Sequence, residues 1–435
     1  MQNFKLKYGE QEIELALEGA KTINTLYENP MEEIKDIKEA FRRAVEDDVV
    51  SSQPLKNLIS SDDKVTVIIS DITRFWMRQD IICELLVRYL NETMCVPFAN
   101  IVVLIALGTH RMHSANEHEK LTSSYVYNNV AQVLDHDCDA DDLLYVGTTP
   151  LGTEVSVNPL AVGRKLIVIG ATVHHLMSGY GGGRKSIVPG IASRNTIKMN
   201  HIRALDPVLP QTYEKVGSGK FSSNPINIDM QDAANLVSPT FGINICVNSA
   251  SKHSALFCGG FEQAWKESCR YIQKSYGLPI EYEADVVFVS CGGFPKDLNF
   301  YQSTKSLFNG IRALKPGGTI VLFAECREGS GAGDFFDWIV PLKAGNLDES
   351  LRKDFTIGGY IFYAACESIK KGNVYMLSEL APEETKDMGV KSYSDINELM
   401  KHVDIKDKDV YVIPYGGSLV PQLRDEYDSL TADIV

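Results

Sequence analysis

Short apolar runs alternate with helical patterns along most of the chain. Val65–Ile69, Ile101–Leu107 and Leu166–Ile169 are nearly continuous apolar segments of strand length, and Asp80–Asn91 between the first two carries apolar residues at helical spacing. Strands that are apolar at almost every position are buried on both faces, as in parallel sheets that are covered by their crossover helices. The pattern predicts an α/β fold with a doubly wound, mainly parallel sheet.

The same alternation starts again near residue 280. Asp285–Ser290, Thr319–Ala324 and Val410–Pro414 have the composition of buried strands. Helices are expected over Ser303–Leu314 and over Ser394–Lys401, with the serine that begins the second helix as its cap. The second half of the chain is therefore also predicted to be α/β.

The turn-rich segment 275–279 separates the two patterns. We expect two α/β domains with mainly parallel sheets and with the active site in the cleft between them. The N-terminal, cofactor-binding domain would comprise residues 1–275. The C-terminal domain would comprise residues 276–435 and contribute substrate contacts, with roughly the last 20 residues able to return to the first domain.

The N-terminal region contains two simpler patterns. Residues 1–17 form two short β-type segments around the turn Tyr8–Gln11, which predicts a β-hairpin. Asn29 followed by Pro30 has the order of a helix cap and a first helical residue, and the apolar residues from Ile34 to Val45 follow helical spacing. A helix is therefore expected to open at Asn29-Pro30.

Polar side chains follow the three strands of the first unit, just where each strand ends. Asp71, Thr73 and Arg74 come after the first strand, His110 after the second and His175 after the third. Ligands of open α/β sheets bind at the carboxyl ends of the strands, so we expect these side chains to share one site. Simpler interpretations are a cap for Asp71 or Thr73 and a solvated surface charge for Arg74.

The segment His174–Lys185 combines a histidine pair, a glycine-rich loop and a lysine, and His201 follows. Glycines let the backbone approach a phosphate closely, a lysine can bind phosphate or form a covalent bond to a cofactor, and histidines transfer protons or bind metals. The loop is not a Walker A motif, because Arg184 stands where that motif needs glycine. Neighbours in an extended segment point to opposite sides, so only His175 of the histidine pair is expected to face the site.

The second unit has one comparable segment, at the start of a predicted helix. Tyr301, Gln302 and Lys305 are placed on one face there, where a helix N-terminus favours an anion. Lys305 and Arg74 would hold a carboxylate, arginine through its planar fork and lysine as a point charge. The plainer interpretations are a surface charge for Lys305 and packing for Tyr301. No role is expected for the other histidines, His113, His118, His136, His253 and His402.

Charge and composition narrow the classes of partner. The formal net charge of −14 over 435 residues argues against nonspecific nucleic-acid binding, so an anionic substrate would need a local cluster of cations. No apolar run reaches membrane-spanning length, and the first residues lack the apolar core of a signal peptide. The nine cysteines form no CxxC pair and are interpreted as reduced core residues. We expect a cytoplasmic protein without a nucleic-acid or membrane partner.

Five motifs, in their order along the chain, resemble the lactate racemase family, whose members use a nickel-pincer nucleotide. They are Asp71-Ile72-Thr73-Arg74, Gly108-Thr109-His110-Arg111, the segment from His175 to Lys185, His201, and Tyr301-Gln302-Ser303-Thr304-Lys305. Each motif alone is common, but the ordered set with its spacing is specific. The resemblance extends from about residue 65 to residue 305.

The resemblance implies a cofactor, the nickel complex of pyridinium-3,5-bisthiocarboxylic acid mononucleotide, attached covalently to Lys185 through a thioamide. It also implies maturation by the cofactor-biosynthesis enzymes. His201 would be the protein ligand to nickel, beside two sulfurs and a carbon of the cofactor, a soft donor set that suits square-planar Ni(II). His110 and His175 would be the two acid/base residues.

The remaining motif residues would bind the cofactor's nucleotide or the substrate. The nucleotide would be bound by Thr73, Asp71, Gly179, Gly181, Gly182 and Gly183. The substrate carboxylate and hydroxyl would be oriented by Arg74, Tyr301, Gln302 and Lys305.

The implied function is inversion of C2 of a 2-hydroxyacid by reversible hydride transfer through a 2-keto acid. The chain departs from the family at Phe75-Trp76, where proline is typical, and at Thr356–Phe362, which lacks the family's His-Lys pair. Lactate, a larger 2-hydroxyacid and a sugar acid therefore remain open as substrates. Two other classes of function are a conventional NAD-type oxidoreductase, disfavoured because no GxGxxG follows the first strand, and a non-catalytic ligand sensor.

Overall fold

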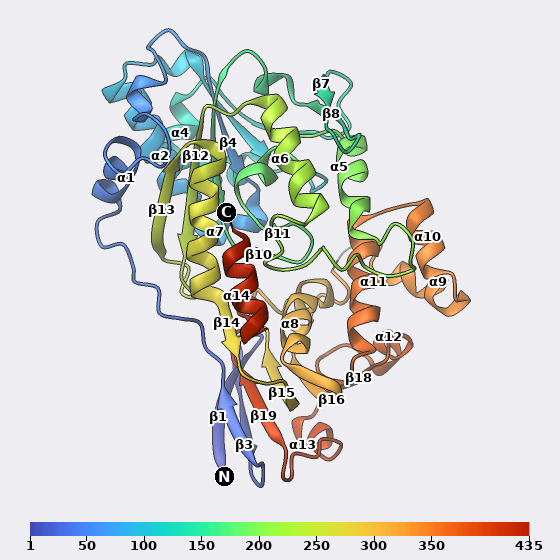
Figure 1. Cartoon of the computed structure of the whole chain (residues 1–435). Helices are drawn as coiled ribbons and strands as arrows, with labels where there is room; N and C mark the ends of the chain where they lie inside the picture. Colours follow the sequence, from blue (N-terminus) through green and yellow to red (C-terminus); the bar gives the residue numbers. More distant parts are fainter. Residues whose placement is uncertain (332, 435) are drawn as a thin grey trace. The chain divides into compact units, whose positions relative to one another are not determined.

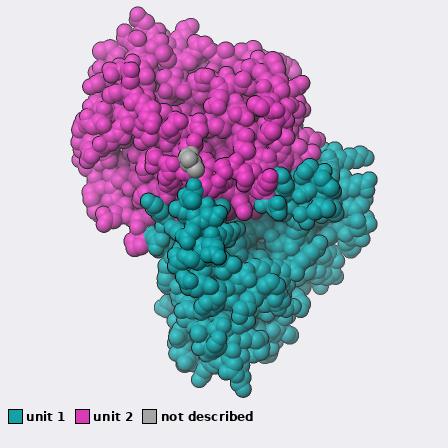
Figure 2. Space-filling view, viewed as in Figure 1, with its two compact units in different colours: residues 1–29, 204–214, 274–432 teal, residues 30–203, 215–273, 433–435 magenta. Residues whose placement is uncertain are grey.

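The computed structural model describes residues 1–331 and 333–434, which form two compact units (Figure 1, Figure 2). Each unit is an α/β structure with a mainly parallel sheet, so the predicted fold class is confirmed. Unit 1 contains residues 1–29, 204–214 and 274–432. Unit 2 contains residues 30–203 and 215–273, together with Asp433 and Ile434.

The sheet of unit 2 has six strands in the order β13-β12-β9-β4-β5-β6, and only β13 runs antiparallel to its neighbour. The strands are β4 (Val65–Ser70), β5 (Ile101–Ala106), β6 (Gln132–Asp135), β9 (Lys165–Ala171), β12 (Phe241–Val247) and β13 (His253–Gly259). The direction in which successive strands are added to the sheet reverses between β4 and β9. Strands β5 and β6 lie on one side of β4, and strands β9 and β12 lie on its other side. Ligands bind at such switch points in open α/β sheets.

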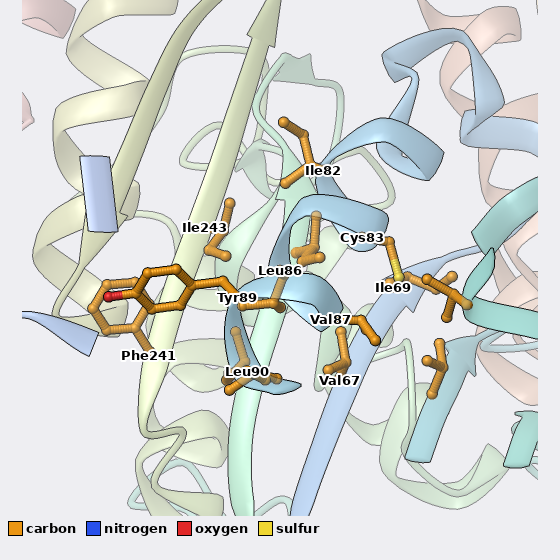
Figure 3. Close-up of a cluster of buried hydrophobic side chains, with 14 of the residues drawn as sticks. Val67, Ile69, Ile82, Cys83, Leu86, Val87, Tyr89, Leu90, Phe241 and Ile243 are labelled. Carbon is orange, nitrogen blue, oxygen red and sulfur yellow. The ribbon is translucent and has the colours of Figure 1, made fainter. Parts of the chain in front are cut away.

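Both faces of this sheet are buried, which explains why its strands are apolar throughout. One face packs in a cluster that includes Val67 and Ile69 of β4 and Ile82 and Leu86 of α2 (Figure 3). The alternate residues of the same strands, such as Ile68, point to the other face and are also inaccessible. The helices that contribute to the first cluster are α1 (Ile37–Glu46), α2 (Gln79–Arg88), α3 (Ala115–Thr122) and α4 (Ser124–Asn129).

The remaining elements of unit 2 follow β6 and β9. They are the hairpin of β7 (Leu144–Thr148) and β8 (Glu154–Val157), the small ladder of β10 (His174–His175) and β11 (Gly179–Tyr180), and the helices α5 (Arg194–His201), α6 (Pro225–Val237) and α7 (Phe261–Tyr276).

The sheet of unit 1 is parallel throughout, in the order β18-β17-β16-β15-β19-β3. Its strands are β3 (Thr22–Thr25), β15 (Ala284–Ser290), β16 (Leu314–Phe323), β17 (Asn373–Leu377), β18 (Val390–Tyr393) and β19 (Asp409–Ile413). The other strands are β1 (Gln2–Tyr8), β2 (Gln11–Leu17), β14 (Gly277–Ile280) and β20 (Val420–Leu423). The helices are α8 (Phe300–Arg312), α9 (Ile339–Ala344), α10 (Leu347–Lys353), α11 (Ile357–Ile369), α12 (Pro382–Thr385), α13 (Ile396–Met400) and α14 (Arg424–Asp433). No helix within 1–331 or 333–434 is long and apolar enough to span a membrane.

The N-terminal hairpin forms as the sequence predicts, but residues 1–29 lie in unit 1 instead of with residues 30–273. The reason is that β3 pairs with β19 at the edge of the unit 1 sheet, and Leu6 and Leu15 of the hairpin join the core of the same unit. At the other end of the chain, the return to unit 2 is shorter than the expected stretch and begins at Asp433. Its carboxylate accepts hydrogen bonds from the N–H groups of Phe221 and Ser222, each at 3.0 Å.

Two predicted helix starts are wrong. The first helix, α1, begins after Asp36, whose carboxylate accepts the N–H groups of Lys38 and Glu39 at 3.1 Å, whereas Asn29 bonds to the chain at Lys274 and Ser275. Near the C-terminus, Asp395 caps α13 in place of Ser394. In both cases a carboxylate that lies directly before the helical turn satisfies its free N–H groups.

Candidate active site

Asp71 and His110 form a pair at the carboxyl ends of the adjacent strands β4 and β5. The Nδ1 atom of His110 lies 2.6 Å from Oδ2 of Asp71, and the Thr73 hydroxyl donates to both carboxylate oxygens, at 2.8 and 3.0 Å. Arg74 donates to the Thr73 hydroxyl at 3.0 Å. Four of the predicted site residues therefore form one connected cluster.

The ionised carboxylate of Asp71 selects the tautomer of the neutral His110 ring. Burial opposes ionisation of Asp71, but the hydrogen bond and charge of His110, the charge of Arg74 and the Thr73 hydroxyl together hold the pKa of the carboxyl below its ordinary value. An ionised carboxylate only accepts, so His110 donates its Nδ1–H and carries the free lone pair on Nε2. The arrangement is that of a general base oriented by a carboxylate.

His175 and Lys185 form a second pair, after β9. The Nδ1 atom of His175 accepts the N–H groups of Met177 and Ser178, at 3.1 and 3.2 Å, which places the ring proton of the neutral imidazole on Nε2. That Nε2 atom lies 2.7 Å from Nζ of Lys185. The contact places the Lys185 amine, a potential nucleophile, directly beside the His175 ring.

The adjacent histidine has a different partner, as the alternation of an extended segment predicts. The Nε2 atom of His174 lies 2.9 Å from Oε1 of Gln273 on α7, and the ring packs on Tyr180 with centroids 5.0 Å apart. His174 is therefore tied to the packing between the small β10–β11 ladder and α7.

The buried side chain of Arg184 stabilises the glycine-rich loop. This role was not predicted from the sequence. The guanidinium is fully buried, donates to the carbonyls of Ser178 and Tyr180 at 2.7 and 3.1 Å and to Oδ1 of Asn227 at 2.7 Å, and lies 3.7 Å from the centre of the Trp265 ring. Burial lowers its pKa to about 9, and no carboxylate in the described part of the chain pairs with it. The loop conformation thus depends on a buried cation bound to carbonyls.

Three of the predicted phosphate-binding glycines are required by the protein itself. Gly179 has φ +74°, and a side chain there would meet the backbone of Lys220. A Cβ on Gly182 would lie 2.9 Å from Oγ1 of Thr172, and one on Gly183 would lie 2.7 Å from the Trp265 ring. Gly181 donates its N–H to the carbonyl of Val173 and accepts from the Trp265 indole. The loop packs tightly on the protein, and a role in phosphate binding stays a prediction.

His201 is the last residue of α5 and is buried. Its Nδ1–H donates to the Ile197 carbonyl at 3.0 Å, so Nε2 carries the lone pair. Burial lowers the pKa of the imidazole to about 3, and the ring is therefore neutral at ordinary pH. A neutral histidine whose other nitrogen donates to a carbonyl has the state of a metal ligand.

The three predicted substrate residues of α8 lie in unit 1. Asn299 caps the helix by accepting the Gln302 N–H, and Lys305 donates to Oε1 of Gln302 at 2.5 Å. Tyr301 packs edge-on against Phe335 with ring centroids 5.9 Å apart. The helix face that the sequence predicts is therefore present, with Lys305 exposed.

Comparison with protein-family models finds two matches that together cover most of the chain. Residues 8–209 match the model described as the lactate racemase N-terminal domain. Residues 280–420 match the model described as the lactate racemase C-terminal domain.

Two relatives are similar over most of their length. A lactate racemase of Thermoanaerobacterium thermosaccharolyticum is 28% identical over 438 residues, which is 97% of this chain and 99% of the relative. A lactate racemase of Lactiplantibacillus plantarum is 30% identical over 314 residues, which is 71% of this chain and 70% of the relative.

Two solved structures are similar in fold to this chain. The structure of the lactate racemase apoprotein from Thermoanaerobacterium thermosaccharolyticum matches with a TM-score of 0.85 at 28% identity and covers 97% of this chain and 100% of that chain. A protein from Thermotoga maritima matches with a TM-score of 0.63 at 19% identity, over 89% of this chain and 97% of that chain, which shows similarity of fold.

Proposed function

The chain belongs to the lactate racemase family, and from this membership we propose that it is a racemase or epimerase that inverts C2 of a 2-hydroxyacid with the help of a nickel-pincer nucleotide on Lys185. The observation that carries the proposal is the 2.7 Å contact between His175 and Lys185. It puts a candidate acid/base residue beside the amine that is assigned to cofactor attachment.

The chemistry explains why a hydride acceptor would be used. Removing the α-hydrogen of a 2-hydroxycarboxylate as a proton builds a second negative charge next to the carboxylate. Removing it as hydride, while a base takes the hydroxyl proton, avoids that charge and leaves a planar 2-keto acid. When bound, the cofactor supplies a pyridinium-type carbon that accepts a hydride and returns it.

His110 is prepared for the proton step. Its Nε2 lone pair accepts the substrate hydroxyl proton, and the Asp71 carboxylate on Nδ1–H stabilises the imidazolium that results. A second acid/base residue is needed because the two enantiomers present their hydroxyl groups differently. We assign that role to His175.

Attachment of the cofactor would also change the state of His175. A thioamide nitrogen is uncharged and lacks the basic lone pair of an amine, so acylation of Lys185 would change the hydrogen bonding at Nε2 of His175. His175 would then be available to the substrate oxygen. The same pair of side chains would thus serve cofactor attachment first and proton transfer afterwards.

The residues of unit 2 fit the proposed cofactor. His201 is neutral and has its lone pair on Nε2, as a nickel ligand requires, while Lys185 provides the attachment amine. Thr73, Asp71 and the loop glycines would support the nucleotide. This assignment implies the cofactor-biosynthesis enzymes as partners in maturation.

The substrate would be a small 2-hydroxyacid or sugar acid. From the resemblance to the family, we assign the carboxylate and hydroxyl contacts to Arg74, Tyr301, Gln302 and Lys305. Arg74 is partly exposed beside the Asp71–His110 pair, and Lys305 extends from the first turns of α8. Arginine and lysine each bind a carboxylate through charge-assisted hydrogen bonds.

The proposal is tested by producing the full chain together with the cofactor-biosynthesis enzymes. We expect intact-mass analysis to show an addition on Lys185 and chiral chromatography to show scrambling at C2 for at least one of a panel of 2-hydroxyacids and sugar acids. The K185A variant is the matched control and should show neither. A wild-type protein that turns over substrate with an unmodified Lys185 would refute the assignment.

A further inference from the structure

A second aspartate–histidine pair, Asp135 and His113, lies close to the Asp71–His110 pair. His113 follows His110 in the loop after β5, and both its backbone N–H and its Nδ1 bond to Asp135, the last residue of β6, at 2.6 Å to Oδ2 and 2.8 Å to Oδ1. The side chains of His113 and Asp135 are only 1% and 3% exposed. This pair is a buried, directional contact between two strand ends.

The other nitrogen of His113 reaches the third strand end. Its Nε2 atom accepts the backbone N–H of Ile72 at 3.1 Å, and Ile72 directly follows Asp71 after β4. Because Nε2 accepts, the ring proton lies on Nδ1 and is donated to Asp135. One imidazole therefore ties the ends of β4, β5 and β6 together, next to the Asp71–His110 pair.

The surroundings of His113 also resemble a metal site, but the hydrogen bonds argue for a different role. His113, His118 and Asp135 each offer a ligand atom within 4.8 Å of the others, and Nε2 of His118 lies 3.0 Å from Oδ1 of Asp135. A metal on Nδ1 of His113 would need the lone pair of that nitrogen, and a neutral imidazole has only one such nitrogen. That nitrogen is already Nε2, the acceptor for Ile72.

His110 depends on Asp71 for its orientation. The His110 side chain is 49% exposed, so packing alone does not hold the ring, whereas Asp71 is buried and bonds to Nδ1. We propose that His113 is a positioning residue, which anchors the backbone at Ile72 and thereby fixes Asp71 and the Nδ1–H tautomer of His110. The effect of His113 on catalysis rests on the proposed function, but its effect on the position of Asp71 and on the tautomer of His110 does not.

The experiment reads the tautomer of His110 in the protein without cofactor, by long-range ¹H–¹⁵N spectra of ¹⁵N-histidine-labelled full-length chain. His113→Leu removes both side-chain contacts, whereas His113→Gln keeps an amide oxygen for Ile72 and an amide N–H for Asp135. His118→Gln removes a neighbour of the same carboxylate without touching Ile72 and is the matched control. Hydrogen exchange of the Ile72 amide is measured on the same samples.

We expect His110 to be the Nδ1–H tautomer in wild type, His113→Gln and His118→Gln, and to become a mixture of tautomers in His113→Leu. The Ile72 amide should exchange on the order of tenfold faster or more in His113→Leu, as expected for loss of one hydrogen bond at a buried group. Folded His113→Leu protein with the wild-type tautomer and exchange rate would overturn the proposal.

Two further outcomes are decisive. If His113→Leu does not fold, His113→Gln carries the test, and folded His113→Gln protein that has lost the Nδ1–H tautomer of His110 would overturn the proposal. Stoichiometric binding of added Zn²⁺ that requires both His113 and His118 would establish a metal site in its place. Because these readouts need neither cofactor nor substrate, they stay valid if the racemase assignment fails.

Discussion

The Nε2 atom of His175 lies 2.7 Å from Nζ of Lys185, while Nδ1 of the same ring accepts the backbone N–H groups of Met177 and Ser178. The contact joins the residue assigned to cofactor attachment with one assigned to proton transfer. The two roles are nevertheless chemically different, so substitutions can separate them.

The first prediction separates them with His175→Gln. Glutamine donates a hydrogen bond to Lys185 but does not transfer protons, so the mass addition on Lys185 should persist while kcat falls by roughly 10²–10⁴-fold, the usual contribution of a general acid or base. Peptide mass spectrometry and chiral chromatography check the two halves. A His175→Gln enzyme with wild-type kcat would remove His175 from the mechanism.

The second prediction concerns the Asp71–His110 pair. Asp71→Asn removes the carboxylate that fixes the Nδ1–H tautomer, so kcat should fall by roughly 10²-fold or more in a protein that still carries the cofactor. Thr73→Ala removes the hydroxyl that donates to both oxygens of that carboxylate but leaves the contact of Asp71 with His110, and it should cost about tenfold or less. Equal losses for the two variants would contradict the assigned role of Asp71.

The third prediction is a pH dependence of stability. Despite burial, the pKa of Asp71 is held below its ordinary value of 3.8 by His110, Arg74 and Thr73. A carboxyl whose pKa is lower in the folded than in the unfolded state stabilises the fold above the unfolded pKa, and the contribution is lost as pH falls through the folded value. Urea unfolding at several pH values should therefore show the difference between wild type and Asp71→Asn narrowing below about pH 4. A constant difference down to pH 3 would be inconsistent with this.

The fourth prediction concerns the buried Arg184. Arg184→Met removes a buried charge but leaves the carbonyls of Ser178 and Tyr180 without their donors, and we expect the loss of hydrogen bonds to outweigh the gain. The free energy of unfolding should fall by about 2–4 kcal/mol in denaturant titrations. Arg42→Met, at an exposed arginine with three carboxylate partners, is the control and should leave the free energy of unfolding nearly unchanged. Arg184→Met protein as stable as wild type would show that the guanidinium does not hold the loop.

The central strands were predictable because burial on both faces leaves a continuous apolar run that needs no partner to be recognised. The placement of residues 1–29 in unit 1 was not predictable from the sequence. β3 is a four-residue edge strand, and Thr22 finds its partner Asp409 at a separation of 387 residues. Local sequence does not encode such a pairing. The helix start predicted from Asn29 and Pro30 was wrong for a similar reason. The Asn29 side chain donates to the carbonyl of Lys274, which is far away in the sequence, and does not cap a helix.

In the candidate site, too, some features could be predicted from the sequence and others could not. The contact between Asp71 and His110 could be predicted from the sequence, because parallel strands place their carboxyl ends along one edge. The sequence predicted no role for His113, although it follows the same strand as His110; its partner Asp135 is 22 residues away along the chain. The glycine loop was interpreted by its resemblance to phosphate loops, whereas the need for Gly179 and Gly183 comes from contacts with Lys220 and Trp265.

The most direct test of the mechanism is the fate of the C2 hydrogen. The cofactor-loaded enzyme is given one enantiomer of its substrate in D₂O, and the hydrogen isotope at C2 of the opposite enantiomer is read by mass spectrometry and ¹H NMR. Hydride transfer to and from the cofactor predicts that the inverted product retains protium at C2. Deuterium at C2 of the product would mean proton abstraction and would contradict the account.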